Sequence, residues 1–294
     1  MIDTWRLIID EPADGATNMA RDEALLATHA EGTTPPTLRL YRWRPACLSL
    51  GRFQRASAVD RSACARASVA IVRRPSGGRA LLHDDELTYA IVARADHPLL
   101  GGESILAIYQ RISLALLAGL RRLGVEAELT PVTKDQRRKT KDQSVSIDVH
   151  SLKPENDSHL SSVLGPSSLG SAACFDTPAA FELTVAGRKL VGSAQTRHAG
   201  SVLQHGAIPL APHAARLAEL LLQPPDDLGT RMITLNQALG RSVGFDEIAQ
   251  ALIAGFREQW GVPFEHGELS NCEQYEEQRL LAAKYADDRW TYGR

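Results

Sequence analysis

The feature that most constrains this chain is a short apolar run that ends in two arginines and a Ser-Gly-Gly turn. Residues 69–72 predict a buried strand, and residues 80–82 begin a second strand. Paired glycines allow positive φ and bring backbone N–H groups within reach of a ligand. The flanking arginines suit an anionic or carbonyl-bearing ligand, because a guanidinium stays charged and presents a fork of donors. An ordinary Gly-Gly hairpin with solvated arginines is the alternative.

Charge and hydropathy exclude two classes of function. The 294 residues are 44% hydrophobic and 23% charged, with a net charge of −2, which is the composition of a soluble globular protein. This balance excludes a strongly basic nucleic-acid binder. No apolar run approaches the roughly 20 residues needed to cross a bilayer, and no secretory signal opens the chain. We therefore expect a cytoplasmic protein without nucleic-acid or membrane partners.

The cysteines give no support for a metal or redox-dithiol site. Cys47, Cys64, Cys174 and Cys272 are widely separated, and no Cys-x-x-Cys pair occurs. Zinc sites and redox dithiols usually show closely spaced pairs. In a reducing compartment we expect free thiols, most of them acting as small buried hydrophobic residues.

A second group of motifs lies between residues 174 and 208. In chain order they are Cys174-Phe175, Gly187-Arg188-Lys189, Gly192-Ser193-Ala194 and Gln204-His205-Gly206. Together with the Ser-Gly-Gly turn and the Glu-Leu-Thr-Tyr run at 86–89, they make the chain resemble the lipoate ligase and octanoyltransferase family. Within it, the resemblance is greatest to the octanoyltransferases that depend on a cysteine. It covers nearly the whole chain apart from an insertion after Thr130, and several motifs in the right order are more specific than any one of them.

The resemblance implies an α+β fold, with a mixed, largely antiparallel sheet flanked by helices, as in the catalytic domain of biotin and lipoate protein ligases. We expect a single catalytic domain over residues 1–294, with a helical C-terminal part at 212–294. Residues 131–171 lack hydrophobic periodicity and are rich in Ser, Asp and Pro, which predicts a mobile insertion. Its basic cluster at 134–141 either meets an acidic carrier protein or is a solvated loop.

Hydrophobic patterning predicts the individual elements. Strands are expected at 5–10, 37–43 (half-buried), 87–93 and 125–129, and an antiparallel meander at 181–185, 188–197 and 202–208. Helices are expected at 18–26, 60–68, 104–123, 213–222, 246–260 and 276–285. Thr17 or Asn18 is the expected N-cap of the first helix.

The resemblance implies an octanoyltransferase of lipoate biosynthesis. Its donor would be octanoyl-acyl carrier protein, and its acceptor a lysine of a lipoyl-dependent protein, such as the glycine cleavage H protein or a 2-oxoacid dehydrogenase E2 subunit. A thioester is more activated than an amide, so the transfer needs neither ATP nor a cofactor. Cys174 would be the nucleophile, because a thiolate forms a second thioester that keeps the acyl group activated. Lys189 would lower the thiol pKa, donate to the oxyanion or carry the proton of the incoming amine.

The resemblance also implies a set of substrate-binding residues. They are Arg73, Arg74, Ser76, Gly77, Gly78, Arg79, His83, Gly192, Ser193, Ala194, His205 and Gly206. The two histidines either line the site or are structural residues held by hydrogen bonds.

Three other functions compete with this interpretation. An ATP-dependent lipoate ligase would usually carry Gly at the position of Arg79 and would not depend on a cysteine. An amidotransferase between lipoyl proteins also uses a cysteine, so Cys174 does not exclude it. A carrier-binding module without catalysis is disfavoured by the presence of both Cys174 and Lys189. We expect a monomer without a metal.

Overall fold

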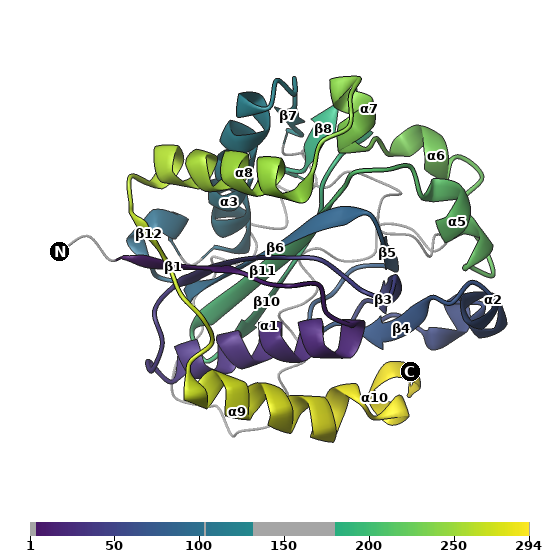
Figure 1. Ribbon diagram of the computed structural model, residues 1–294, viewed down its shortest axis with the longest axis horizontal. Coiled ribbons are helices and arrows are strands. Elements are labelled where there is room, and N and C mark those ends of the chain that lie inside the picture. Colours follow the sequence, from purple (N-terminus) through teal and green to yellow (C-terminus); the bar gives the residue numbers. More distant parts are fainter. Residues whose placement is uncertain (1–3, 103, 132–179, 294) are drawn as a thin grey trace, which may run out of the picture.

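A mixed sheet forms the centre of the molecule (Figure 1). The computed structural model describes residues 4–102, 104–131 and 180–293; Cys174 and residues 132–171 of the predicted insertion lie outside this part. The sheet runs in the order β10 (Gly192–His198), β11 (Ser201–Pro209), β6 (Glu86–Arg94), β2 (Thr37–Tyr41), β1 (Trp5–Ile9) and β12 (Phe264–His266). Pairing is antiparallel from β10 to β2 and parallel from β2 through β1 to β12.

Two smaller sheets carry the motifs of the sequence. One has the order β4 (Ala70–Arg73), β3 (Cys47–Leu50), β5 (Leu81–His83), and the other β7 (Glu128–Leu129), β8 (Leu183–Val185), β9 (Arg188–Lys189). Strand β3 lies between β4 and β5, parallel to the first and antiparallel to the second. The Ser-Gly-Gly turn therefore does not close a simple hairpin, and the alternative of an ordinary Gly-Gly hairpin is wrong.

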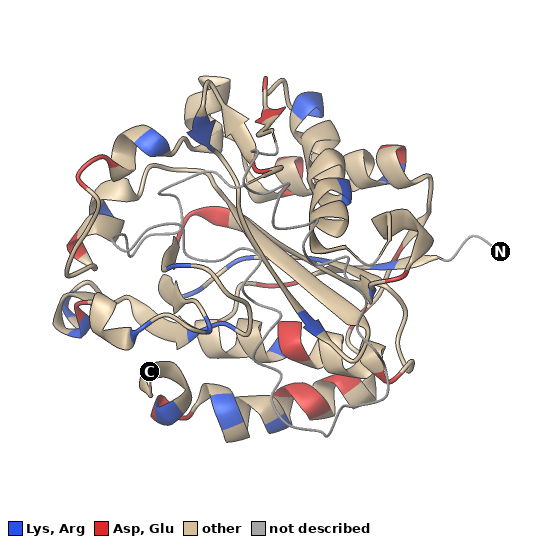
Figure 2. Cartoon of the chain, turned by 180° about the vertical axis from the view of Figure 1, so that it is seen from behind, with Lys and Arg blue, Asp and Glu red and all other residues tan. Residues whose placement is uncertain are grey.

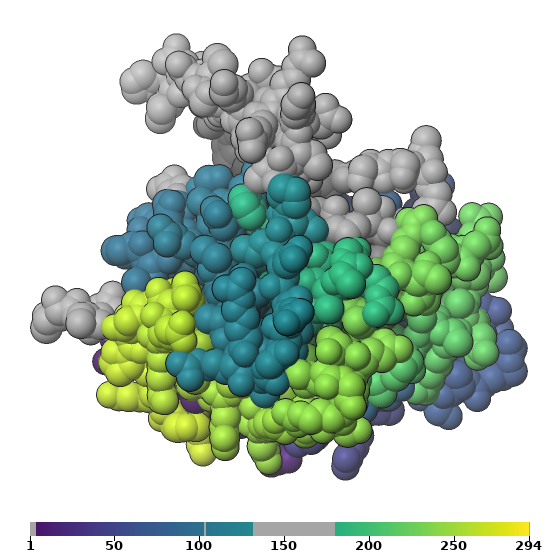
Figure 3. Space-filling model, turned by 90° about the horizontal axis from the view of Figure 1, so that it is seen from above, coloured from purple at the N-terminus to yellow at the C-terminus, as the bar shows by residue number. Residues whose placement is uncertain are grey.

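Helices cover both faces of the central sheet (Figure 1). Helices α3 (Ile105–Arg122) and α8 (Phe245–Trp260) lie on one face, and α1 (Gly15–Ala30) and α9 (Asn271–Leu280) on the other. Helices α3 and α8 lie side by side (Figure 3) and meet backbone to backbone, since a Cβ on Gly255 would lie 2.2 Å from the amide nitrogen of Gly119. Apolar residues of α3, α8 and the sheet, among them Ile112, Leu116 and Phe256, form the largest core cluster.

Charged residues of both signs lie along α1 and α9 (Figure 2). Arg21 of α1 pairs with Glu277 of α9 at 3.0 Å, and Lys284 pairs with Glu23 at 2.7 Å. Such partly exposed pairs contribute little stability individually. They orient the C-terminal segment, which continues through a π-helical turn at Leu281–Tyr285 to α10 (Asp288–Tyr292).

Shorter elements connect these layers. They are η1 (Ala56–Ala58), α2 (Arg61–Arg66), η2 (Pro98–Leu100), α5 (Ala214–Glu219), α6 (Leu228–Arg231) and α7 (Leu235–Leu239). No helix in the described ranges is both long and apolar enough to span a membrane.

The predicted fold class is confirmed, and several details of the prediction are wrong. The N-cap of α1 is Asp14, whose carboxylate accepts from the amide of Thr17 at 2.8 Å. Strand β2 is buried along its whole length rather than half-buried. Strand β7 keeps only the last two residues of the predicted strand at 125–129, and β12 was not predicted.

The predicted strand at 188–197 is also wrong, because it divides into β9 and β10, which belong to different sheets. After Lys189 the amides of Leu190 and Val191 both point to the carbonyl of Leu183, at 2.9 and 3.4 Å. The chain therefore turns away from β8 before β10 begins, and two separate hairpins replace the expected meander.

Candidate active site

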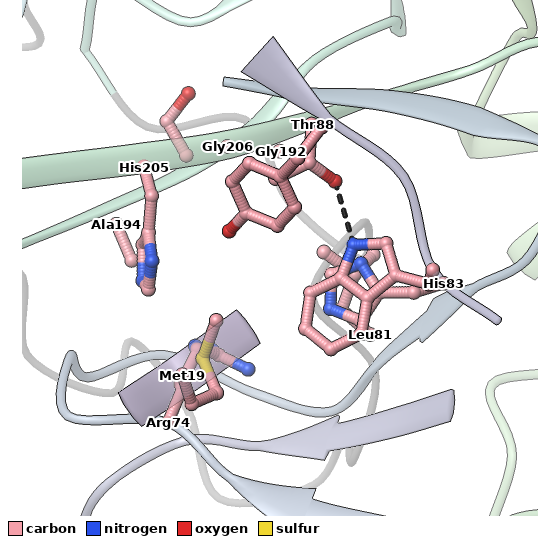
Figure 4. Close-up of a pocket in the computed structure, with 12 residues that line it drawn as sticks. Met19, Arg74, Leu81, His83, Thr88, Gly192, Ala194, His205 and Gly206 are labelled. Atoms are coloured by element: carbon pink, nitrogen blue, oxygen red, sulfur yellow. Dashed lines mark hydrogen bonds between the residues drawn. The ribbon is translucent and has the colours of Figure 1, made fainter. Parts of the chain in front are cut away.

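A narrow pocket lies where the central sheet meets α1 and the small β4–β3–β5 sheet (Figure 4). Its lining residues are Met19, Tyr41, Trp43, Arg74, Leu81, His83, Thr88, Gly192, Ser193, Ala194, His205 and Gly206. Apolar and aromatic side chains form much of the wall, while the two histidines lie on opposite sides of the cavity. This combination suits a ligand with an apolar chain and one polar end.

The β10–β11 hairpin brings two predicted motifs together in this wall. Ser193 pairs with Gly206, and Ala194 pairs with His205. A Cβ on Gly206 would lie 2.6 Å from Ser193 Oγ and 2.7 Å from the ring of Tyr89, so only glycine allows the strands and the ring this close. The Tyr89 hydroxyl lies 2.7 Å from Ser193 Oγ and fixes the serine side chain.

His205 uses both ring nitrogens for hydrogen bonds. Its Nδ1 lies 2.8 Å from Asp22 Oδ2, and its Nε2 lies 2.5 Å from Ser76 Oγ. The histidine therefore lines the pocket and also connects helix α1 to the Ser-Gly-Gly turn. The two roles that the sequence left open for this residue are compatible.

His83 has a similar set of contacts on the opposite side. Its Nδ1 lies 2.6 Å from Glu86 Oε1, and its Nε2 lies 2.8 Å from Ser49 Oγ. The ring stacks on Trp43, with 3.8 Å between ring centroids. Trp43 in turn donates to Thr88 Oγ1 at 2.8 Å, as drawn in Figure 4.

Arg74 holds the Ser-Gly-Gly turn from inside. Its guanidinium donates to the carbonyl oxygens of Ser49, Gly77 and Arg79 at 3.1, 2.7 and 2.8 Å. Gly78 has a φ of 95°, and a Cβ on Gly51 would lie 1.9 Å from the Gly78 carbonyl oxygen. The turn is therefore fixed by Arg74 and by backbone packing against Gly51.

Arg73 lies outside the pocket, fully buried. It donates to the carbonyl oxygens of Gly51, Gln54 and Thr291 at 2.6, 2.7 and 2.8 Å. The indole of Trp290 donates to the Arg73 carbonyl at 2.9 Å. These contacts connect the strand before the turn to the loop after β3 and to α10.

The predicted substrate-binding residues therefore fall into two groups. Those that line the pocket are Arg74, His83, Gly192, Ser193, Ala194, His205 and Gly206. Those that do not line it are Arg73, Ser76, Gly77, Gly78 and Arg79, which belong to the turn behind it or flank that turn.

Lys189 is buried at the end of the β8–β9 hairpin, and it does not line the pocket. Its Nζ donates to Glu182 Oε1 at 2.6 Å, and the two side chains are only 2% and 5% exposed. The hairpin turn has positive φ at Ala186 and Gly187, 49° and 74°. Sequence reasoning missed Glu182. The hairpin register could have indicated it, because Thr184 pairs with Lys189 and Glu182 lies on the same face two residues earlier.

Sequence reasoning also missed the pocket residues Met19, Tyr41, Trp43, Leu81 and Thr88 as binding residues. Behind them it missed Asp22, a charged residue on the apolar face of α1. Burial alone would raise the pKa of Asp22, but the charge of Arg39 and the hydrogen bond from His205 hold it below its ordinary value. A carboxylate on a core-facing helix position was the available signal, because such groups are rarely buried without a partner.

Within the described ranges, no group of three or more histidine, cysteine or carboxylate side chains is arranged to hold a metal ion.

Comparison with known proteins places these features in context. Residues 14–257 match the model of the lipoyl protein ligase A/B catalytic domain. The chain is 40% identical to octanoyltransferase LipM of Moorella thermoacetica, over 98% of this chain and 97% of that protein. It is 36% identical to octanoyltransferase LipM of Bacillus subtilis, over 99% of each.

Solved structures show the same fold at lower identity. A lipoate-protein ligase A bound with ATP is 23% identical and superposes with a TM-score of 0.74, over 99% of each chain. The bipartite lipoate protein ligase of Thermoplasma acidophilum is 22% identical, with a TM-score of 0.73 over 99% of this chain and 97% of that one.

Proposed function

We propose that this chain, which belongs to the lipoyl protein ligase A/B catalytic domain family, takes an octanoyl group from octanoyl-acyl carrier protein and passes it to a protein lysine. It is an octanoyltransferase, since curated octanoyltransferases are 36–40% identical to it over nearly their full length. That full-length similarity is the observation that carries the proposal. The acceptor is a lipoyl-dependent protein, such as the glycine cleavage H protein or a 2-oxoacid dehydrogenase E2 subunit.

The pocket supports this proposal through its lining. Met19, Tyr41, Trp43 and Leu81 offer apolar surface to an unbranched acyl chain. Each methylene group that such a chain buries contributes about 0.8 kcal/mol. The backbone of the β10–β11 hairpin and the guanidinium of Arg74 supply the polar end, where the thioester carbonyl would lie.

The reaction proceeds in two acyl transfers. The Cys174 thiolate attacks the thioester carbonyl, the tetrahedral oxyanion collapses, and the thiol of the carrier protein leaves with a proton. The neutral amine of the acceptor lysine then attacks the acyl-cysteine. The amide forms, the Cys174 thiolate leaves, and the amine loses one proton. Because both donors are thioesters, the transfer needs no ATP or other cofactor.

Lys189 is assigned to this chemistry as the cation that stabilises the thiolate and the oxyanion. Glu182 supports the assignment, since its carboxylate fixes the position of the ammonium at 2.6 Å in a buried site. We further propose that the enzyme works as a monomer in the cytoplasm.

The test is acylation of the purified enzyme with octanoyl-acyl carrier protein in the absence of ATP. Mass spectrometry should find one octanoyl group on Cys174, labile to hydroxylamine. Cys174→Ala should abolish both the adduct and the transfer. Cys272→Ala is the matched control, since this exposed thiol should be dispensable. Transfer that persists in Cys174→Ala and requires ATP and free lipoate would replace this proposal with an adenylating ligase.

A further inference from the structure

Two pocket-lining side chains from different strands form hydrogen bonds with the same buried carboxylate. Tyr41 of β2 donates its hydroxyl to Asp22 Oδ2 at 2.9 Å, and Nδ1 of His205 on β11 lies 2.8 Å from the same oxygen. Asp22 itself lies on α1, fully buried, and does not line the pocket. One oxygen atom thus determines where both the phenol and the imidazole lie.

The charge of Asp22 is compensated on the side away from the pocket. Its Oδ1 accepts from Arg39 Nη1 at 2.6 Å, and the side chains of both residues are 0% exposed. Arg39 also pairs with Asp10 at 2.6 Å and donates to Asn18 Oδ1 at 2.7 Å. Burial alone would raise the pKa of Asp22, but the positive charge of Arg39 and the hydrogen bond from His205 lower it, so the carboxylate stays ionised in a buried position.

An ionised carboxylate fixes the proton arrangement of the histidine. A carboxylate only accepts hydrogen bonds, so the hydrogen on the neutral His205 ring must be at Nδ1. The Nε2 atom is then an acceptor, and it takes the hydroxyl hydrogen of Ser76 at 2.5 Å. Asp22 therefore determines the orientation of a hydroxyl in the Ser-Gly-Gly turn through an intermediate ring.

We propose that Asp22 is a positioning residue for acyl transfer, which fixes Tyr41 and His205 in the pocket wall and, through His205, the Ser76 hydroxyl. The inference rests on the proposed function, in which this pocket holds the acyl group. Loss of Asp22 should lower kcat/KM for octanoyl transfer about tenfold or more, as loss of a supporting partner behind a site residue usually does.

The experiment compares Asp22→Asn with Asp10→Asn. Each variant removes one of the two carboxylates that pair with Arg39, but Asp10 pairs with Arg21 and Arg39, neither of which lines the pocket. At equal folded fraction, measured by circular dichroism, Asp22→Asn should lose about tenfold or more of kcat/KM. The kcat/KM of Asp10→Asn should stay within about twofold of the wild-type value, because Asp22 still holds Tyr41 and His205 in that variant.

A second variant covers the case in which Asp22→Asn does not fold. The double variant Asp22→Leu with Arg39→Met removes both charges of the buried pair, so that neither charge is left in the core without the other. It should fold and still show the loss of transfer. Tyr41→Phe removes only the phenol contact and should give a smaller loss.

The tautomer of His205 gives an independent readout. In protein with ¹⁵N-labelled histidine, the wild-type ring should carry its hydrogen at Nδ1, and Asp22→Asn should shift it toward Nε2, because the amide can donate to Nδ1. A purely structural role for Asp22 would not link this shift to the loss of kcat/KM.

Two results would overturn the positioning role. One is a wild-type His205 with its hydrogen at Nε2. The other is transfer by Asp22→Asn, or by the folded double variant, within about twofold of Asp10→Asn, because the supporting contact would then have no kinetic effect. If wild-type enzyme failed to use octanoyl-acyl carrier protein, the proposed function would fall, and the tautomer measurement would still decide the role of Asp22.

Discussion

Breaking the Lys189–Glu182 pair should destabilise the fold as well as stop the reaction. Both side chains are almost completely buried, at 2% and 5% exposure, with 2.6 Å between Nζ and Oε1. Lys189→Met keeps most of the side-chain volume but leaves the Glu182 carboxylate without its ammonium in a site that water does not reach. The buried pair therefore predicts a large loss of stability in this variant.

The magnitude follows from the burial of the two charges. Removing one partner of a buried ion pair typically costs about 3–5 kcal/mol, and solvent screening does not reduce it at this exposure. For a chain of this size 1 kcal/mol shifts Tm by roughly 2–4 °C, so we expect Lys189→Met to lose about 6–20 °C. Glu182→Gln should lose a similar amount. The double variant Lys189→Met with Glu182→Gln should recover most of it, because no charge is then buried.

Calorimetry and octanoyl transfer should be measured on all three variants. Transfer should fall by a factor on the order of 10² or more in Lys189→Met, and the double variant should not restore it, because the cation itself is missing. This comparison separates the proposed catalytic role of Lys189 from its structural one. A Tm of Lys189→Met within about 2 °C of the wild type would refute the reasoning, since the contact would then carry no buried-pair energy.

Three further predictions follow from burial, close packing and charge. Burial raises the pKa of the Cys64 thiol to about 11, so iodoacetamide at neutral pH should label exposed Cys272 and leave Cys64 unmodified, as peptide mass spectrometry would show. Gly206→Ala would place a Cβ 2.6 Å from Ser193 Oγ, and it should cost about 1–3 kcal/mol in denaturant unfolding and lower kcat/KM. Burial raises the pKa of Glu273, but the hydrogen bonds from Arg6 and Ser270 lower it by more, so that the net pKa lies below its ordinary value of 4.5. Its stabilisation is therefore present above pH 4.5 and lost as the pH falls through the folded pKa, so the difference in unfolding midpoint between wild type and Glu273→Gln should shrink below that pH.

The parts of the site that could be predicted from the sequence are those built by local pairing. The β10–β11 hairpin turns at Gly200, and its two strands lie next to each other in the chain. The motifs at 192–194 and 205–206 therefore meet for a reason that a sequence pattern can show. The Glu182–Lys189 contact is local too, because the two residues lie seven positions apart on either side of one turn. The alternation of side chains along the two strands is enough to indicate it.

The parts that could not be predicted depend on contacts between distant segments. Strand β3 inserts between β4 and β5, and no feature of the glycine-rich stretch indicates a third strand between its flanks. Asp22 meets Arg39 and His205, which lie 17 and 183 residues away in the chain. A buried charge on α1 signals that partners exist, but only the packed sheet identifies them.

The two consecutive arginines show how neighbouring residues of one motif come to have different roles. Consecutive side chains of an extended segment point to opposite sides, so Arg73, the last residue of β4, and Arg74, the residue after it, do not face the same ligand. Arg74 faces the pocket and holds the Ser-Gly-Gly turn, while Arg73 faces the other way and donates to the carbonyls of Gly51 and Thr291. The alternation of side chains therefore turns one arginine toward the pocket and the other toward α10. It follows that the C-terminal helix α10, although it contributes no residue to the pocket lining, supports the backbone on which Arg74 is placed.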